Sequence, residues 1–436
     1  MNNIIGIRHE DKYKMERRVA IPPDHAQRLI EQKNLRLLVE KSPKRIFPEE
    51  EYKEAGAEIV DSLQEAPVIF GVKEMPEDFF EEEKTYVFFS HVIKGQAYNM
   101  PMLKTMMDRR CNLIDYETVT DEAGKRLIFF GRYAGLAGMI NSLWAFGERL
   151  AVMGIDTPFK KLHQASQYKS LEEAKTAISE VGFEIADKGV PEKLKPMVVG
   201  FTGYGNVSRG AQEILNLLPV KEISPSELLT LQDRNDLAAN VIYKVVFKEQ
   251  DMVVPRDEKQ KFHLQDYYNN PKKYRGVFEQ YLPHMTILMN CMYWDDRYPR
   301  IVTKDYLEKL YSEGEPRLKV IGDVTCDPDG SVECTHKGTE IDEPVFVYNP
   351  FTREPKMGFE GQGILDMAVD ILPSELPRES SIAFGDALEQ YIPAIANADY
   401  NKDFDNLELP QPIKRAMILH KGELTPDYKY LKQYVR

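Results

Sequence analysis

The segment Met197–Leu215 constrains the fold more than any other part of the chain. It reads MVVGFTGYGNVSRGAQEIL and joins an apolar run, a turn with two glycines and a helical pattern of apolar residues. This order predicts a strand, a tight turn and a helix. Gly203 can adopt backbone angles that are closed to other residues, and Gly205 lets the main chain approach a pyrophosphate at the start of the helix. The segment therefore predicts a dinucleotide-binding α/β domain.

The glycine turn departs from the common G-x-G-x-x-G pattern. Serine stands at the third glycine position and the next glycine is Gly210. We predict that the turn contacts a nucleotide through Gly203, Tyr204, Gly205, Asn206, Val207 and Ser208. The alternative is a purely structural turn, because a glycine turn in an α/β domain need not bind a ligand.

Composition limits the classes of protein to which the chain can belong. A length of 436 residues predicts two domains or three. The net charge of −13 disfavours nucleic-acid and anionic-membrane partners. No apolar run reaches the length of a signal peptide or the roughly 18 residues of a membrane span, so we expect a cytoplasmic protein. Four scattered cysteines predict free thiols, and no metal-ligand cluster is visible.

Polar residues follow three apolar segments in the N-terminal third. Lys73 and Glu74 follow the apolar segment 68–72, His91 follows segment 86–89, and Glu117 follows segment 113–114. Strands that alternate with helical spacers predict a parallel sheet, in which ligands bind beyond the carboxyl ends of the strands. We therefore expect Lys73, His91 and Glu117 along one edge. The alternative is that these residues merely cap turns.

The N-terminal third also contains the cations of a candidate anion site, which are Arg18, Lys73, His91, Lys94 and Arg126. Such a cluster in an acidic chain suits a substrate with several carboxylates. A lysine near other cations and a histidine can both transfer protons. Glu74 and Glu117 could hold an ammonium group. Beside a nicotinamide, this set fits oxidation or formation of a C–N bond in an amino dicarboxylic acid.

The second half of the chain contains further predicted strands and a C-terminal segment that we expect to pack on another domain. Two apolar strands end at Asn290 and Asp323 and should deliver polar groups to the nicotinamide end of the cleft. The polar stretch 248–274 reads as a surface excursion. The last hundred residues contain few strand–helix–strand signals, so we expect helices that pack on another domain. The predicted domains are 1–131 completed by 346–436, and 132–345.

Eight segments resemble a known family and occur in the family's order. They are ERRVAIPP, VIFGVKEMP, FFSHVIKGQ, FGRYAGLAGMI, FTGYGNVSRGAQ, NCMYW, GDVTCDPDGSVE and ILPSELPRES. Together they resemble the lysine–ketoglutarate reductase part of the bifunctional aminoadipic semialdehyde synthases, along essentially the whole chain. More remotely, the chain resembles the lysine-forming saccharopine dehydrogenases and the alanine dehydrogenase/transhydrogenase N-terminal domain.

The resemblance implies a reaction and roles for residues. The reaction is the reductive condensation of the ε-amine of lysine with 2-oxoglutarate to saccharopine, with hydride from a nicotinamide. Lys73 and His91 resemble the family's acid–base pair. Three cations match positions that bind substrate carboxylates (Arg18, Lys94 and Arg126), and two acids match the acidic positions beside them (Glu74 and Glu117). Residues 203–208 match the turn that binds the pyrophosphate, and Asn290 and Asp323 match positions near the nicotinamide.

The resemblance also implies an architecture and a partner. It implies two Rossmann-like doubly wound domains with a cleft between them and C-terminal helices that return to the first domain. Because the chain stops at Arg436, we expect the second enzyme of the bifunctional protein to be absent and saccharopine to pass to a separate dehydrogenase. The oligomeric state stays open, a homo-oligomer included.

Two questions stay open from the sequence. The first is the cofactor: in Val220–Ser224, Glu222 would favour NAD, whereas Lys221 and Ser224 could accept a 2′-phosphate, and the resemblance favours NADPH over NADH. The second is the activity. Alternatives are another NAD(P)-dependent amino-acid or opine-type dehydrogenase, and a nucleotide-sensing protein that has lost its chemistry. The number of cations disfavours alanine as the substrate, and the presence of Lys73 with His91 disfavours a sensor.

Overall fold

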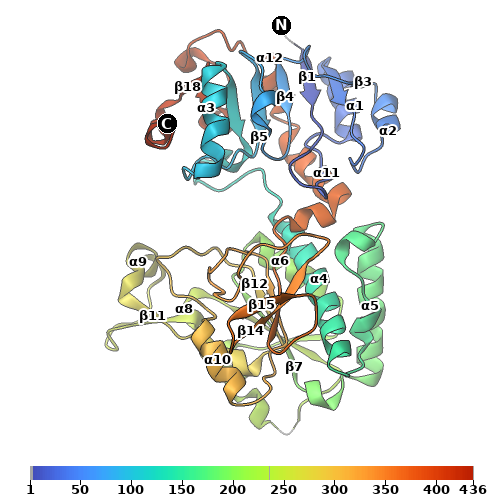
Figure 1. Cartoon of the computed structure of the whole chain (residues 1–436), viewed down its shortest axis with the longest axis vertical. Helices are drawn as coiled ribbons and strands as arrows, with labels where there is room; N and C mark the ends of the chain where they lie inside the picture. The colour runs from blue at the N-terminus through green and yellow to red at the C-terminus, as the bar shows by residue number, and fades with distance from the viewer. Residues whose placement is uncertain (1–2, 235, 436) are drawn as a thin grey trace. The chain divides into compact units, whose positions relative to one another are not determined.

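The computed structural model describes residues 3–234 and 236–435 and divides them into two compact units. The first unit comprises residues 3–130 and 377–435, blue to cyan and red in Figure 1. The second comprises the described residues of 131–376. Each unit has a hydrophobic core of its own. The C-terminal helices thus lie in the first unit, as predicted.

The first unit is built on an eight-stranded sheet. Its strands are β1 (Ile4–Ile7), β2 (Arg36–Glu40), β3 (Glu58–Val60), β4 (Val68–Phe70), β5 (Thr85–Phe88), β6 (Asn112–Asp115), β17 (Met417–His420) and β18 (Glu423–Leu424). They lie in the order β18-β17-β6-β5-β4-β1-β2-β3. The six strands from β6 to β3 run parallel, and β17 and β18 pair antiparallel at one edge. Every residue of β4, β5 and β6 is buried, as expected of a parallel sheet that is covered on both faces.

Six α-helices belong to this unit within the described residues. They are α1 (Pro23–Lys33), α2 (Glu49–Glu54), α3 (Met100–Asp108), α11 (Pro377–Leu388), α12 (Ile392–Asn397) and α13 (Gln411–Arg415). Helix α1 begins at Pro23, whose fixed φ suits the first helical position. It ends at Lys33, and Asn34 caps it in the left-handed conformation, with a φ of 52° and its N–H donating to the carbonyl of Ile30.

The second unit contains another eight-stranded sheet and a separate two-stranded one. The larger sheet contains β7 (Met197–Thr202), β8 (Val220–Glu222), β9 (Ile242–Phe247), β12 (Ile287–Asn290), β13 (Val320–Asp323), β14 (Val345–Asn349), β15 (Glu354–Met357) and β16 (Ile364–Met367). Their order is β15-β14-β16-β13-β12-β7-β9-β8. The strands from β16 to β8 run parallel, and β14 pairs antiparallel with both of its neighbours. β10 (Val253–Pro255) and β11 (Tyr274–Gly276) form the smaller sheet.

Seven described α-helices accompany these sheets. They are α4 (Gly131–Val152), α5 (Leu171–Lys188), α6 (Asn206–Leu215), α7 (Pro225–Thr230), α8 (Glu249–Met252), α9 (Leu264–Asn269) and α10 (Lys304–Ser312). Two α/β units with mostly parallel sheets agree with the predicted fold class. Among the described residues, no helix is long and apolar enough to cross a membrane.

Two expectations about the second unit are wrong. Residues 346–376 lie here and not in the first unit, because β14, β15 and β16 pair into this sheet. Their antiparallel hairpin lacks the strand–helix–strand pattern from which the domains were predicted. The stretch 248–274 is also more than a surface excursion: it forms α8, β10 and α9, and Tyr267 and Tyr274 are buried.

Helices α4 and α6 touch backbone to backbone at two glycines. A β-carbon at Gly135 would lie 1.9 Å from the carbonyl oxygen of Val207, and one at Gly210 would lie 2.1 Å from that of Arg132. Gly210 thus provides the close helix packing, whereas Ser208, at the third glycine position of the turn, is buried and accepts a hydrogen bond from Gln212. Only glycine fits at this helix contact.

Gly210→Ala should therefore destabilise the second unit. Overpacking of this kind costs about 1–3 kcal/mol, although alanine is the better helix former by about 1 kcal/mol. Trp144 and Trp294 are the two tryptophans of the chain and both lie in this unit, so fluorescence during urea unfolding reports on it. Gly205→Ala is the control, since its β-carbon would meet nothing within 4 Å. Equal urea midpoints for the two variants would contradict the packing argument.

Candidate functional site

The carboxyl ends of β4, β5 and β6 lie side by side in the first unit. The three strands are adjacent and parallel, with Phe70 opposite Val87 and Phe88 opposite Asp115. Lys73 and Glu74 follow β4, His91 follows β5, and Glu117 lies in the 3-10 turn after β6. Topology therefore brings these residues to one edge of the sheet, as the sequence predicts; their roles stay predictions.

His91 has an unusual backbone conformation. Its φ of 49° lies in the left-handed region, which residues other than glycine rarely adopt and which often marks a functional site. The amide of buried Asn99 stabilises this turn by donating to the carbonyls of Ser90 at 3.1 Å and His91 at 3.3 Å. The imidazole also stacks on Phe89 with an interplanar angle of 15°. Asn99 thus holds the backbone at His91, and Phe89 contacts its ring.

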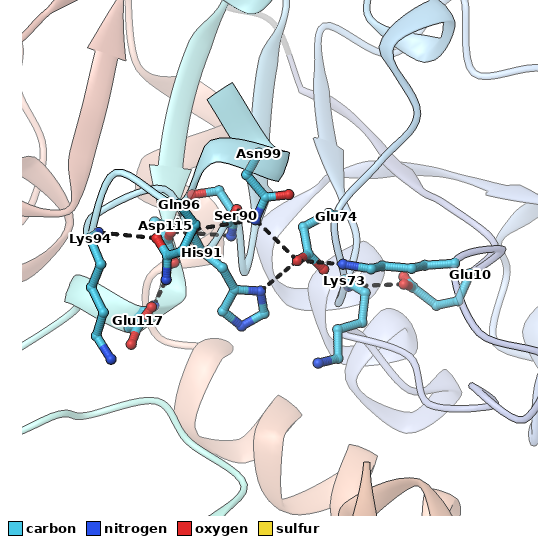
Figure 2. Close-up of polar contacts among 11 residues, drawn as sticks. Glu10, Lys73, Glu74, Ser90, His91, Lys94, Gln96, Asn99, Asp115 and Glu117 are labelled. Carbon is cyan, nitrogen blue, oxygen red and sulfur yellow. Dashed lines mark hydrogen bonds and ion pairs between the residues drawn. The ribbon is translucent and has the colours of Figure 1, made fainter. Parts of the chain in front are cut away.

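Glu74 fixes which nitrogen of His91 is available. Its Oε1 accepts from Nδ1 of His91 at 2.8 Å and from Nζ of Lys12 at 2.6 Å (Figure 2). Burial acts to raise the pKa of Glu74, but the bonds and charges of His91 and Lys12 lower it to about 2. Because an ionised Glu74 engages Nδ1, Nε2 is the ring nitrogen left to face a substrate.

Lys73 is positioned through its backbone by Glu10. The carboxylate of Glu10 accepts from the N–H groups of Val72 at 2.7 Å and Lys73 at 2.9 Å. Burial, together with the charge of Glu16, raises the pKa of Glu10 to about 7. The Lys73 ammonium lies 5.4 Å from the ring centroid of Tyr13. In Figure 2, the side chains of Lys73 and His91 extend in the same direction from the strand ends.

Asp115 joins the ends of β5 and β6. It accepts from the backbone N–H and hydroxyl of Ser90, which precedes His91, and from the N–H of Glu117 at 2.8 Å. The side chain is fully buried, and burial raises its pKa to about 6 despite these bonds. Asp115 thus fixes the two segments that carry His91 and Glu117.

Two of the three cations that are predicted to bind substrate carboxylates have an acidic partner within the chain. Arg18 is buried and donates two bonds to Glu16, from Nε at 2.8 Å and Nη2 at 2.6 Å. Arg126 is half-exposed and forms an ion pair with Glu117. Lys94 is exposed, and its backbone N–H bonds to Gln96. The cations are therefore present in the same unit, with two of them already partly neutralised.

The predicted nucleotide turn lies in the second unit between β7 and α6. Gly203 has a φ of 80°, the left-handed conformation for which glycine is needed. A β-carbon at Gly205 would point into open space, and α6 begins without a side-chain cap on its first N–H groups. A cavity of about 390 Å³ adjoins the turn and is lined by Gly203, Tyr204 and Gly205. Free N–H groups beside an open glycine fit a pyrophosphate.

Asn290 and Asp323 lie at the ends of β12 and β13, buried in a polar network. Asn290 accepts from Thr202 at 2.9 Å and donates to Asp323 at 2.8 Å. The hydroxyl of Thr335 lies 2.7 Å from both Asp323 and Asp366. One hydroxyl proton cannot serve two carboxylates, so one carboxyl must carry a proton. Burial accordingly raises the pKa of both acids. Their contact with a nicotinamide stays a prediction.

Glu222 and Ser224 lie further from the glycine turn than the sequence suggested. Glu222 ends β8 and Ser224 follows two residues later; β8 forms the edge of the sheet, and β9 separates it from β7. Glu222 forms an ion pair with Lys244 at 2.8 Å, and Ser224 caps α7 by accepting from the N–H of Glu227. Both residues do line a hollow that also reaches Tyr204 of the turn.

Comparisons with known proteins agree with this architecture. The family "Alanine dehydrogenase/PNT, N-terminal domain" matches residues 6–137. Alpha-aminoadipic semialdehyde synthase of Arabidopsis thaliana is 39% identical over 99% of this chain and 41% of the relative. The mitochondrial protein of that name from Mus musculus is 33% identical over 99% of this chain and 48% of the relative. The chain is homologous to the aminoadipic semialdehyde synthases. It spans a little under half of their length.

Other similarities extend beyond these synthases. A relative from Emericella nidulans named saccharopine dehydrogenase [NAD(+), L-lysine-forming] is 27% identical over 89% of this chain and 90% of its own length. Among solved structures, an L-alanine dehydrogenase superposes with a TM-score of 0.63 at 18% identity and covers 99% of this chain and 100% of that one. A transhydrogenase from Sinorhizobium meliloti gives 0.53 at 13% identity and covers 97% and 100%. These two structures support the fold alone.

Sequence reasoning missed the residues that support the strand-end cluster of the first unit. Glu10, Asp115 and Asn99 are buried and bond mainly to backbone groups. Asp115 ends an apolar strand and could have been noticed on that ground. Asn99 stands in an ordinary polar stretch, so nothing in its spacing marks it. Within the described part of the chain, no group of three His, Cys, Asp or Glu could hold a metal ion.

The depressed pKa of Glu74 predicts a pH-dependent contribution to stability. A carboxyl with a folded pKa of about 2 and an unfolded pKa near its ordinary value stabilises the fold above about pH 4.5. The contribution is lost as the pH falls towards 2. At about 1.4 kcal/mol per pKa unit, Glu74→Gln should cost up to about 3 kcal/mol at pH 6.

The stability difference between the wild type and Glu74→Gln should shrink as the pH is lowered from 5 to 3. Urea unfolding followed by far-UV circular dichroism at each pH measures it. Glu82→Gln is the control, because Glu82 is exposed. A difference that stays constant with pH would show that the amide acts by lost packing and not by lost charge.

Proposed function

We propose that this chain is a lysine–2-oxoglutarate reductase, an NADP(H)-dependent oxidoreductase that acts on CH–NH groups. It would join the ε-amine of L-lysine to the keto carbon of 2-oxoglutarate and reduce the product to saccharopine. The observation that carries the proposal is the pairing of Lys73 and His91 at adjacent strand ends, each oriented by a buried carboxylate. Homology along 99% of the chain supports it.

The reaction needs proton transfers that this pair can supply. The amine must lose a proton before its lone pair attacks the keto carbon, and the keto oxygen must gain one. The carbinolamine oxygen then needs a second proton so that water leaves and a protonated imine forms. A reduced nicotinamide, when bound, would supply the hydride, and hydride addition to the carbon of the protonated imine gives a secondary amine. Nε2 of His91 and Nζ of Lys73 extend in the same direction and are the proposed donors and acceptors.

The charged neighbours give the site its preference for amino dicarboxylic acids. We assign the substrate carboxylates to Arg18, Lys94 and Arg126, whose guanidinium groups and ammonium suit carboxylate oxygens. Glu16 and Glu117, which now bond Arg18 and Arg126, would share these cations with the substrate. Glu74 and Glu117 would stabilise the ammonium form of the amine donor.

The cofactor is assigned to the second unit. The open position at Gly205 and the uncapped start of α6 support a pyrophosphate at residues 203–208. We propose NADPH as the preferred nucleotide and NADH as the weaker alternative. Lysine, 2-oxoglutarate and saccharopine are the proposed small-molecule partners.

Gly205→Val tests the nucleotide assignment. Its side chain would enter the space that the pyrophosphate needs, while the fold has room for it. We expect the dissociation constant of NADPH or NADH to rise at least tenfold, which is about 1.4 kcal/mol or more. Fluorescence titration measures it, and an unchanged urea midpoint shows that the protein is folded. Unchanged titration curves for both nucleotides would remove the turn from the site.

Lys73→Met and His91→Gln test the proton-transfer pair. Positioned acid–base groups contribute about 10²- to 10⁴-fold in rate, so each variant should lose turnover by that factor while nucleotide affinity stays unchanged. The double variant should lose less than the product of the single losses, because both groups act on the same protons. Steady-state turnover against pH measures this.

Lys53→Met and His163→Gln are the matched controls, since both residues are exposed and lie outside the strand-end cluster. If either test variant kept more than about a third of wild-type turnover at every pH, this would be far above the residual turnover expected after the loss of an acid–base group. That residue would then be only a turn cap and not a proton-transfer group.

A further inference from the structure

We propose that cofactor preference is set at the end of β9, where Glu249 binds the 3′-hydroxyl of the adenosine ribose, which both nucleotides carry, and Arg209 with Lys248 binds the 2′-phosphate of NADPH. The inference rests on the proposed nucleotide site in the second unit and goes further by naming the residues that distinguish NADPH from NADH. It replaces Glu222, the residue at which the sequence pattern pointed. All of the residues involved belong to one compact unit.

The order of the strands in the sheet indicates that β9 leads to the ribose site. In dinucleotide-binding sheets, the ribose is held at the end of the strand beside the one that leads into the glycine turn. That neighbour is β9 here, although β8 comes first along the chain. Phe247 pairs with Thr202, the residue directly before Gly203. Lys248 and Glu249 therefore leave the sheet at the level of the glycine turn.

Glu249 faces the cavity beside that turn. Its carboxylate accepts from the hydroxyl of Tyr268 at 2.6 Å and from that of Tyr204 at 3.2 and 3.3 Å. The cavity of about 390 Å³ is large enough for part of a nucleotide and is lined by Gly203, Gly205 and several tyrosines. A carboxylate already turned towards hydroxyl donors beside the glycine turn suits ribose hydroxyls.

A second hollow adjoins this cavity across Tyr204, which lines both. Arg209, from the first turn of α6, and Lys248 line the hollow, and both are exposed. Neither side chain forms an ion pair with another residue that the structure describes. Two such cations beside a ribose ligand, in a chain of net charge −13, form a local anion site.

The acidic residues around this hollow already have partners. Glu222 pairs with Lys244, Glu227 accepts from Ser224, and Asp251 accepts from the backbone N–H of Lys248 at 2.8 Å. Because these bonds partly neutralise or tie down the carboxylates, they oppose a phosphate less than unpaired acids would. Glu222 is also separated from the glycine turn by the whole of β9.

Direct binding of NADPH and NADH to the 436-residue chain tests the proposal. The double variant Arg209→Gln/Lys248→Gln should weaken NADPH about tenfold or more and NADH less than about threefold, because only NADPH carries the 2′-phosphate. Glu249→Gln should weaken both nucleotides through the ribose. Glu222→Gln is the matched control and should change neither affinity. Calorimetric or fluorescence titration gives the dissociation constants.

The outcomes separate this inference from the proposed function. If the wild type binds neither nucleotide, the proposed function fails. If the wild type binds but the double variant weakens both nucleotides equally or neither, the 2′-phosphate assignment is wrong. If Glu222→Gln weakens binding and Glu249→Gln does not, the ribose is bound at β8 and the inference is overturned. Unfolding midpoints of all variants show that each one is folded.

Discussion

Parallel pairing of adjacent strands is the constraint on which the candidate site depends. β4, β5 and β6 run in one direction, so their carboxyl ends come to one edge and bring Lys73, His91 and Glu117 into one neighbourhood. None of these residues is near another in sequence. The same rule in the second unit brings the ends of β7, β9 and β12 around the glycine turn. The two sheets thus present their chemistry at strand ends, where loops free the side chains from the core.

Buried carboxylates fix the positions of the residues at these strand ends. Burial of an acid is costly unless it is bonded, and here each acid bonds to the segment that it supports. Glu10 holds the backbone at Lys73, Asp115 holds that at Ser90 and Glu117, and Glu74 holds the ring of His91. Desolvation raises the pKa of Glu10 and Asp115, whereas the contacts with His91 and Lys12 lower that of Glu74. The environment therefore moves the pKa of similar carboxyl groups in opposite directions.

Local sequence patterns predicted many of the strands and helices but not the order in which the strands pair. The glycine turn predicted the strand before it and the helix after it, and apolar runs predicted the strands whose ends carry the candidate residues. The order of β8 and β9 in the sheet could not be predicted from the sequence, because local patterns identify strands but do not show which strands pair. The hairpin of β14 and β15 was assigned to the wrong unit for the same reason. Glu10 and Asn99 were missed because a single buried polar residue leaves no repeating signal.

The proposed reaction joins an amine to a keto acid and reduces the product in one protein. Loss of nicotinamide absorbance with purified protein, L-lysine, 2-oxoglutarate and NADPH tests it, with each component omitted in turn and the product mass determined. We expect oxidation of NADPH only when both substrates are present, and one equivalent of saccharopine for each NADPH consumed. Oxidation at the same rate without lysine, or with ammonium in its place, would contradict it.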